Sequence, residues 1–421
     1  MSPQMVPGSD AETDGFEEAE ELRYIARQPI LDAHGRVFGY ELLFRSGPGA
    51  YFHGDGDVAT RTMLDNSVIF GIEKLTIGLP AFVNCTTQTL IEDQVFVLPP
   101  RLTILEILED VEPTPSVIEA CIKLKKAGFR LALDDFLWKA GLEPLVKLAD
   151  FIKVDFTLLD AAGRASLRKQ LKGSTVELVA EKVETQEEYQ QARAEGFKLF
   201  QGYYFCRPIL LTNRKLPANH ASYLEILRIM QNETMDLRKL GQLVKRDASL
   251  TYRLLRLVNS PMYAVRLEVR SVDSALVMVG EETFRRIATL AIVSELNGNQ
   301  PVEILRMALL RARFCELAAA FCGLNPEEQY LLGLFSLIPS MMRVPMSELA
   351  PVLPLREKIR DVLLGSSGPE SSLLHWTECY ERGEWVKCDT IASFYGLNED
   401  RVISCRQDAL VWAEAALKSA V

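Results

Sequence analysis

Between residues 22 and 212 the chain alternates between short, continuously apolar runs and longer stretches with helical periodicity, and this alternation limits the folds it can adopt. Continuously apolar runs are typical of parallel strands that are covered on both faces. Repeated strand–helix units of this length predict an α/β fold, either a doubly wound sheet or a barrel. The predicted strands are Val37–Leu43, Ala81–Asn84, Leu102–Ile107, Phe129–Leu133, Phe151–Val154, Val176–Ala180 and Phe197–Phe205.

Signals at the ends of two predicted helices agree with this alternation. Ser116 and Glu119 have the spacing of a capping box before an apolar-periodic stretch, and Thr185 and Glu188 have the same spacing. A glycine follows each of these stretches, at the position where helices commonly end in a left-handed residue. The helices between the strands are thus predicted from their caps as well as from their periodicity.

Beyond Asn213 the strand pattern stops and helical periodicity continues through the rest of the chain. Asn325 and Pro326, followed by two glutamates, are typical of a helix start. A chain of 421 residues also exceeds what one hydrophobic core normally organises. We therefore predict two folded domains behind an acidic, disordered leader. The predicted division is 1–21 for the leader, 22–212 for the strand–helix domain and 213–421 for an all-α domain, with Leu216–Asn219 as the connector.

The composition excludes several classes of partner. A formal net charge of −10 argues against general binding to nucleic-acid polymers or to anionic membranes. Apolar runs such as Tyr330–Met342 are too short to span a bilayer. The eight cysteines lack zinc-type spacing and predict reduced thiols, so we expect a cytoplasmic protein. A small anionic ligand is not excluded, because a bound metal ion can reverse the field inside a pocket.

Each predicted strand ends in a carboxylate, an amide or an ammonium group. In a parallel barrel these ends lie at one mouth, where barrel enzymes build their active sites. A single Asp or Asn after a strand is more often a cap for the next helix. Lysine, glutamine and glutamate are not favoured caps, so seven successive cases are better explained by a shared site. The residues are Glu41, Asn84, Glu106, Asp134, Asp135, Lys153, Asp155, Glu181 and Gln201.

The chemistry of this predicted site follows from its residue types. Several carboxylates and an amide oxygen, without His or Cys, predict a hard oxygen site for Mg²⁺ or Mn²⁺ rather than for zinc. Two ions that share the Asp134–Asp135 edge would suit cleavage of a phosphodiester. Lys153 could orient an attacking water, and Arg45 could clamp a phosphate in bidentate fashion.

The segments that carry these residues resemble, in order, the motifs of the bacterial EAL family of cyclic di-GMP phosphodiesterases. Tyr40–Arg45 resembles the EAL signature itself, whose usual form is Glu-Ala-Leu-Leu-Arg. Any one motif is weak, but the ordered set over about residues 22–212 is specific. The other segments are Phe82–Asn84, Leu105–Glu109, Leu133–Phe136, Ile152–Asp155, Ala180–Thr185 and Gln201–Pro208.

This resemblance implies a TIM-like (β/α) barrel that hydrolyses cyclic di-GMP to the linear dinucleotide pGpG with Mg²⁺ or Mn²⁺, with two ions expected. The implied ligands are Glu41, Asn84, Glu106 and Asp134 for the first ion and Asp135 for the second. The implied catalytic residues are Lys153, which would hold the attacking water, and Glu181, as general base or metal partner. The remaining implied roles are substrate contact for Arg45 and Gln201, and bracing of the loop after Asp135 for Glu109 and Glu184.

Three departures from the family pattern leave the activity open. The loop Asp135–Gly141 lacks the family's early glycines, and Lys182 stands where the family has glycine. The stretch from Arg45 to Phe82 is also shorter than is usual in the family, which predicts a reduced nucleotide-covering lobe. Glycine permits backbone conformations that Leu137 and Lys139 resist. Two alternatives therefore remain open: a phosphodiesterase, which the altered loop would make slow, or a catalytically inactive sensor or scaffold.

The second half resembles the HDOD family, which is related to HD hydrolases and associated with signalling output. The residues 213–421 contain no His-Asp doublet, so a binding role is favoured over a second enzyme. The resemblance implies protein partners for this half, and the EAL resemblance implies a possible homodimer. The segments that carry it are Asn232–Leu240, Asp247–Leu250, Leu254–Ser260 and Val272–Gly280.

Overall fold

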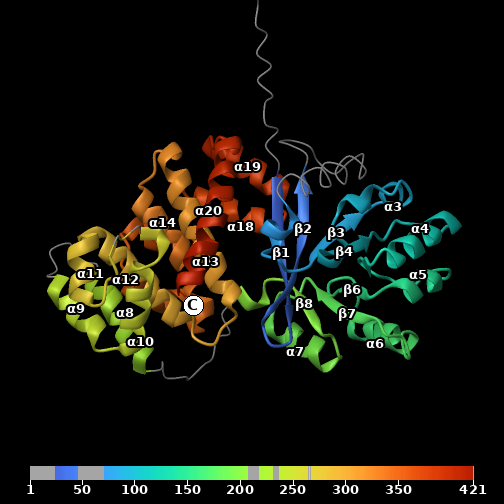
Figure 1. Ribbon diagram of the computed structural model, residues 1–421, viewed down its shortest axis with the longest axis horizontal. Helices are drawn as coiled ribbons and strands as arrows, with labels where there is room; N and C mark the ends of the chain where they lie inside the picture. Colours follow the sequence, from blue (N-terminus) through green and yellow to red (C-terminus); the bar gives the residue numbers. More distant parts are fainter. Residues whose placement is uncertain are drawn as a thin grey trace, which may run out of the picture.

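The computed structural model describes residues 24–45, 71–206, 218–230, 237–263, 265 and 267–420. The predicted disordered leader, residues 1–21, lies outside the described residues, and so do residues 46–70 of the stretch from Arg45 to Phe82, in which a reduced lobe is predicted. The described chain forms a strand–helix barrel followed by an all-helical part, and the two lie side by side (Figure 1). The predicted division near residue 213 falls between described segments, so the domain boundary stays a prediction.

The strands of the first part close into one barrel in chain order, which settles the choice between a doubly wound sheet and a barrel. Neighbouring strands from β2 to β8 are parallel. The first strand, β1, is antiparallel to both of its neighbours, β2 and β8. The strands are β1 Tyr24–Asp32, β2 Val37–Arg45, β3 Ala81–Cys85, β4 Thr103–Ile107, β5 Arg130–Leu133, β6 Phe151–Asp155, β7 Glu177–Glu181 and β8 Leu199–Gln201.

Strand β1 was not predicted from the sequence. Its apolar pattern is interrupted by Arg27, Gln28 and Pro29, and this combination does not favour a strand within a barrel. The strand forms because the tight connection to β2 pairs the two as a hairpin, in which Gln28 lies opposite Glu41. The last predicted strand was too long, since β8 ends at Gln201 and Tyr204–Cys206 form a short 3₁₀ helix, η3.

A layer of apolar side chains fills the barrel near the amino ends of its strands. Phe38 packs against this layer, with its ring centroid 5.7 Å from that of Phe151 and 6.2 Å from that of Phe82. Side chains alternate along a strand, so the residue two positions further on faces the interior as well. The polar ends of the strands therefore lie inside the barrel, above this layer. Its buried members are Ile30, Phe82, Ile104, Ala132, Phe151, Val179 and Leu199.

The helices of the barrel confirm one predicted cap and correct another. Thr185 and Glu188 form the predicted capping box before α7. The predicted box at Ser116 is wrong, because α4 is capped by Thr114 and begins at Pro115, which favours the first helical position. The helices are α2 Ile72–Thr76, α3 Thr87–Ile91, α4 Pro115–Lys126, α5 Glu143–Leu148, α6 Ala161–Gln170 and α7 Gln186–Ala194, with 3₁₀ helices η1 Gln94–Val97 and η2 Pro100–Leu102.

The second part is all-helical in its described residues, as predicted. Asn325 caps α14, which begins at Pro326, also as predicted. The predicted connector, Leu216–Asn219, is wrong in its last two residues, because α8 already begins at Ala218. The helices are α8 Ala218–Met230, α9 Leu237–Lys245, α10 Ala248–Val258, α11 Val272–Val279, α12 Glu281–Asn297, α13 Val302–Cys322, α14 Pro326–Phe335, α15 Ile338–Met342, α16 Met346–Leu349, α17 Glu357–Leu363, α18 Ser372–Glu381, α19 Trp385–Tyr395 and α20 Glu399–Ala420, with 3₁₀ helices η4 Pro261–Tyr263, η5 Ala350–Val352 and η6 Pro369–Ser371.

None of the helices in the described ranges combines the length and the low charge that a membrane crossing requires.

The two parts share a buried interface between the β1–β2 hairpin and helices α13, α18 and α20 (Figure 1). Ala26 of β1 belongs to the same apolar cluster as Trp376 and Tyr380 of α18. The backbone N–H of Ile25 donates a hydrogen bond to the Tyr380 hydroxyl at 3.1 Å, and Arg27 pairs with Glu414 of α20 at 3.0 Å. Apolar packing and polar pairs together fix the helical part against one wall of the barrel.

Candidate functional site

The carboxyl ends of the barrel strands gather the predicted polar residues into one mouth. Phe82, Ile104 and Val179 belong to the interior apolar layer, and each is followed two positions later by a polar residue. The same relation links Ala132, Phe151 and Leu199 to polar residues of β5, β6 and β8. The polar residues are Asn84, Glu106, Asp134, Lys153, Glu181 and Gln201. Glu41 of β2 also belongs to the mouth, because its carboxylate contacts Lys153 and Gln201.

The ammonium group of Lys153 lies at the centre of this mouth. It is 2.8 Å from a carboxylate oxygen of Glu106, 2.8 Å from one of Glu181, 2.9 Å from one of Asp134 and 3.1 Å from one of Glu41. The Lys153 side chain is only 1% exposed. One positive charge thus faces four carboxylates in a place that water hardly reaches.

The pKa values of these groups indicate that the single positive charge of Lys153 does not balance the carboxylates around it. Burial by itself would lower the pKa of Lys153, but the carboxylates around it, Asp134 and Glu106 foremost, hold that pKa well above its usual range. Burial raises the pKa of Glu106 well above its usual value despite Lys153, and it raises the pKa of Glu181 to about 8. Carboxyl groups that resist ionisation in this way need further positive charge nearby.

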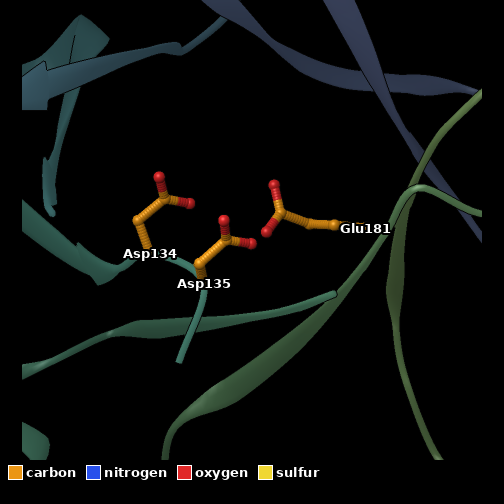
Figure 2. Close-up of side chains that lie close together, drawn as sticks. All are labelled: Asp134, Asp135 and Glu181. Atoms are coloured by element: carbon orange, nitrogen blue, oxygen red, sulfur yellow. The ribbon is translucent and has the colours of Figure 1, made fainter. Parts of the chain in front are cut away.

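Several buried oxygen atoms of the mouth have no hydrogen-bond partner among the described residues: Oδ1 of Asn84, Oε2 of Glu106, Oε2 of Glu181 and Oε1 of Gln201. The carboxylates of Asp134, Asp135 and Glu181 point toward one another (Figure 2), with one oxygen of each within 4.8 Å of the others. Buried acceptors without donors are costly. A hard divalent cation satisfies such oxygens and also supplies the missing charge, so these residues fit Mg²⁺ or Mn²⁺.

Comparisons with known proteins agree with this arrangement. The sequence profile of the EAL domain matches residues 78–208, and that of the HDOD domain matches residues 216–349. YuxH of Bacillus subtilis is 32% identical over 400 residues, which cover 92% of this chain and 97% of YuxH. The cyclic di-GMP phosphodiesterase CdgJ of Vibrio cholerae is 33% identical over 377 residues, which cover 88% of this chain and 87% of CdgJ. The chain belongs to the EAL–HDOD family.

Among solved structures, BlrP1 of Klebsiella pneumoniae in a complex with calcium and cyclic di-GMP is 26% identical. The match covers 49% of this chain and 58% of that chain, with a TM-score of 0.37.

Two residues of the mouth, Gln28 and Lys182, were not predicted from the sequence to contribute to it. Gln28 of β1 accepts a hydrogen bond at 2.9 Å from the Gln201 amide, which also donates to Glu41 at 2.6 Å. Gln28 was missed because its strand was missed. Lys182 was noted only as a replacement for glycine, yet its ammonium bonds to Asp155 and lies 3.8 Å from a carboxylate oxygen of Asp135.

The backbone explains why the EAL family has glycine at the position of Lys182. Lys182 has a φ of +53°, in the left-handed region that glycine enters without strain. Asp135 also has a positive φ, of +38°. In contrast, Leu137 and Lys139 keep negative φ angles, so the loop after Asp135 follows a path that does not require the family's glycines.

Three other predicted residues are placed but their roles stay predictions. Arg45 is the last residue of β2, and its side chain lies outside the described part of the chain. Glu184 borders the mouth near Asp135, whereas Glu109 is exposed in the loop after β4. Burial, Asp134 and Asp155 raise the pKa of Asp135, and Glu109 adds a smaller contribution in the same direction.

The mouth opens into a cavity of about 520 Å³. Its walls come from the barrel and, on one side, from Arg382 and Glu384 of the HDOD part. The charged residues around it are six acids and three bases: Glu41, Asp134, Asp135, Glu181, Glu184 and Glu384 against Lys153, Lys182 and Arg382.

Proposed function

We propose that the barrel hydrolyses cyclic di-GMP to pGpG with two Mg²⁺ or Mn²⁺ ions. The observation that carries this proposal is the set of buried oxygen atoms without donors around Lys153. The relative CdgJ, which the chain matches over most of its length, is named a cyclic di-GMP phosphodiesterase. The excess of acids around the cavity would repel a substrate with two phosphates unless divalent cations were bound, which also supports a metal-dependent reaction.

Five residues would hold the ions. Those of the first ion would be Glu41, Asn84, Glu106 and Asp134, and that of the second would be Asp135. When bound, the ions would supply Lewis acidity, which makes water a better nucleophile and stabilises the charge that develops on the phosphodiester.

The protein's own side chains would position the reactants. Lys153 would donate a hydrogen bond to the attacking water, because its ammonium lies at the centre of the ligand set. Glu181 would accept the proton of that water, since one of its oxygens contacts Lys153 and the other has no donor among the described residues. Gln201 and Arg45 would contact the dinucleotide, and Glu109 and Glu184 would brace the loop after Asp135.

A turnover assay tests this function. The full chain is incubated with cyclic di-GMP and Mn²⁺, and we expect pGpG to accumulate. If the protein binds cyclic di-GMP but forms no pGpG, it is a sensor and the phosphodiesterase proposal is wrong. If it neither binds nor hydrolyses the dinucleotide, the barrel is a scaffold.

The position of Lys182 favours the sensor as a second candidate. Its ammonium contacts Asp155 and approaches Asp135, the residue that would hold the second ion. A cation in this place competes with that ion, because like charges at about 4 Å repel even at a partly exposed site. The protein could then bind the dinucleotide while turning it over slowly.

Replacing Lys182 with glycine is expected to raise turnover at low Mn²⁺ concentration by about tenfold, which corresponds to about 1.4 kcal/mol. The change removes the competing charge, and glycine accepts the φ of +53° without strain. Turnover is measured across a Mn²⁺ titration. The matched control is Arg343→Gly in the HDOD part, where φ is +58°, which changes the backbone preference but not the site. Unchanged or lower turnover in Lys182→Gly would show that Lys182 supports the site.

Three further properties stay predictions from the family resemblance and the composition. They are protein partners for the HDOD part, homodimer formation and a cytoplasmic location.

A further inference from the structure

The HDOD part reaches the mouth of the EAL barrel through the turn between α18 and α19. Arg382 and Glu384 of this turn line the same cavity as Asp134, Lys153 and Glu181. We propose that Arg382 binds a phosphate of the dinucleotide, so that the substrate site is completed by the second domain. This inference rests on the proposed function, because it assumes that a cyclic dinucleotide enters the cavity.

The turn is held in place on both sides of Arg382. Before it, within the helical part, Glu381 is buried and accepts hydrogen bonds from the guanidinium of Arg311 of α13, the shortest at 2.7 Å. After it, Gly383 has a φ of +67° and packs so tightly on β2 that an added Cβ would lie 2.7 Å from Cδ1 of Leu43. The position of Arg382 at the rim is therefore built into the domain interface.

Arg382 itself has donors to offer. Its guanidinium lies 4.9 Å from the centre of the Tyr203 ring, a distance typical of a cation–π contact, which holds the planar group without using its N–H donors. The guanidinium forms no hydrogen bond or ion pair with the described residues, and the hydrogen bond of Arg382 to Cys379 at 3.1 Å comes from its backbone N–H. Tyr203 follows Gln201 by two residues, so the stacking partner belongs to the barrel mouth.

The other two bases of the cavity are already engaged. Lys153 is surrounded by four carboxylates, and Lys182 is bonded to Asp155. Both ammonium groups already face carboxylates, whereas the guanidinium of Arg382 faces none at ion-pair distance among the described residues, and its planar fork matches two phosphate oxygens. The nearby acid Glu384 is paired with Lys387 at 2.9 Å, so it does not neutralise Arg382. A phosphate that extends from the metal-binding acids toward this wall would meet Arg382.

The simplest alternative is that Arg382 only packs on Tyr203 at the surface. Measuring the Kd for cyclic di-GMP in the presence of Mg²⁺ distinguishes this alternative from phosphate binding by Arg382. The titration uses the full chain with Glu181→Gln, which keeps an oxygen at that position but cannot accept the proton, so that turnover is suppressed. Adding Arg382→Ala is expected to raise Kd about tenfold, because a charge-assisted bidentate contact is lost. Arg382→Gln, which retains packing on Tyr203 but not the charge, is expected to raise Kd similarly.

The matched control is Arg401→Ala. Arg401 is also exposed and stacks on an aromatic ring, 5.0 Å from the centre of Phe321, but it does not line the cavity. Its Kd should stay within about twofold of the parent, and melting temperatures should show that all variants fold.

The outcomes separate this inference from the proposed function. If the parent binds and both Arg382 variants bind equally well, Arg382 is not a substrate-binding residue, while the phosphodiesterase proposal stands. If the wild type binds without hydrolysing, the phosphodiesterase proposal is wrong, and the same Kd comparison still decides the role of Arg382. If the wild type shows neither binding nor turnover, both are wrong.

Discussion

Replacing Lys153 with methionine is expected to destabilise the metal-free protein by about 3–5 kcal/mol and to lower kcat at least about 100-fold. The Lys153 ammonium lies within 3.1 Å of a carboxylate oxygen of each of Glu41, Glu106, Asp134 and Glu181. Without it, these four carboxylates, three of them buried, lose this counter-charge, and the water that Lys153 would position is no longer held. Methionine keeps the length of the side chain, so the loss reports the charge rather than a cavity.

The loss of stability should grow with rising pH. Glu181 already has a pKa raised to about 8, and because Lys153 lowers the pKa values of Glu106 and Glu181, its removal raises both further. Between about pH 4.5, where glutamate ionises in the unfolded chain, and pH 8, the folded state then binds more protons than the unfolded state. Stability falls as pH rises under that condition. The loss is thus expected to be smaller at pH 5 than at pH 8.

Chemical denaturation in the presence of a chelator measures this effect, followed by the fluorescence of the four tryptophans of the chain, of which Trp138 reports on the barrel. The control is Lys125→Met, which removes a half-exposed pair with Asp150 (2.6 Å) and should cost less than about 1 kcal/mol. Equal losses in the two variants would mean that Lys153 is not the counter-charge of the mouth.

Replacing Glu41 with alanine is expected to lower turnover at least about 100-fold while the protein stays folded. Glu41 accepts hydrogen bonds from Lys153 at 3.1 Å and from Gln201 at 2.6 Å, so its removal takes away a proposed metal ligand and one acceptor of the amide that is proposed to contact the substrate. The fold should tolerate the change, because three carboxylates still surround Lys153 and the excess negative charge of the cluster decreases.

Production of pGpG and the melting temperature are measured on the same sample of Glu41→Ala. Glu177→Ala is the control, because Glu177 lies at the amino end of β7, away from the mouth, in a loose pair with Lys198 at 3.6 Å. Retained turnover in Glu41→Ala would remove Glu41 from its proposed role as a ligand.

The site could be predicted from the sequence to the extent that it depends on strand periodicity. Apolar residues such as Phe82 and Ile104 are followed two positions later by Asn84 and Glu106, and a strand places such pairs on one face whatever its neighbours are. The carboxyl ends of parallel strands share one edge, so the gathering of these residues was predicted before their contacts were known.

Strand β1 and Gln28 escaped prediction for the opposite reason. The sequence Tyr24–Asp32 carries Arg27, Gln28 and Pro29, which do not favour a strand by themselves. The strand is stabilised by pairing with β2 and β8 and by the helices packed on Ala26, all of which are interactions between distant residues. The strand propensities of the single residues do not include these interactions between distant parts of the chain.

The sequence by itself determined that successive strands carry oxygen ligands and one lysine at their carboxyl ends, because alternation along each strand and the residue types are local properties. The closure of these strands into a barrel was decided by the tertiary structure. Only the tertiary structure decided that Lys153 contacts four carboxylates at once, that Lys182 approaches Asp135, and that Arg382 stands at the same cavity. These are distances between side chains from different strands and from two domains. They depend on how the barrel closes and how α18 docks on β1, which no local pattern in the chain encodes.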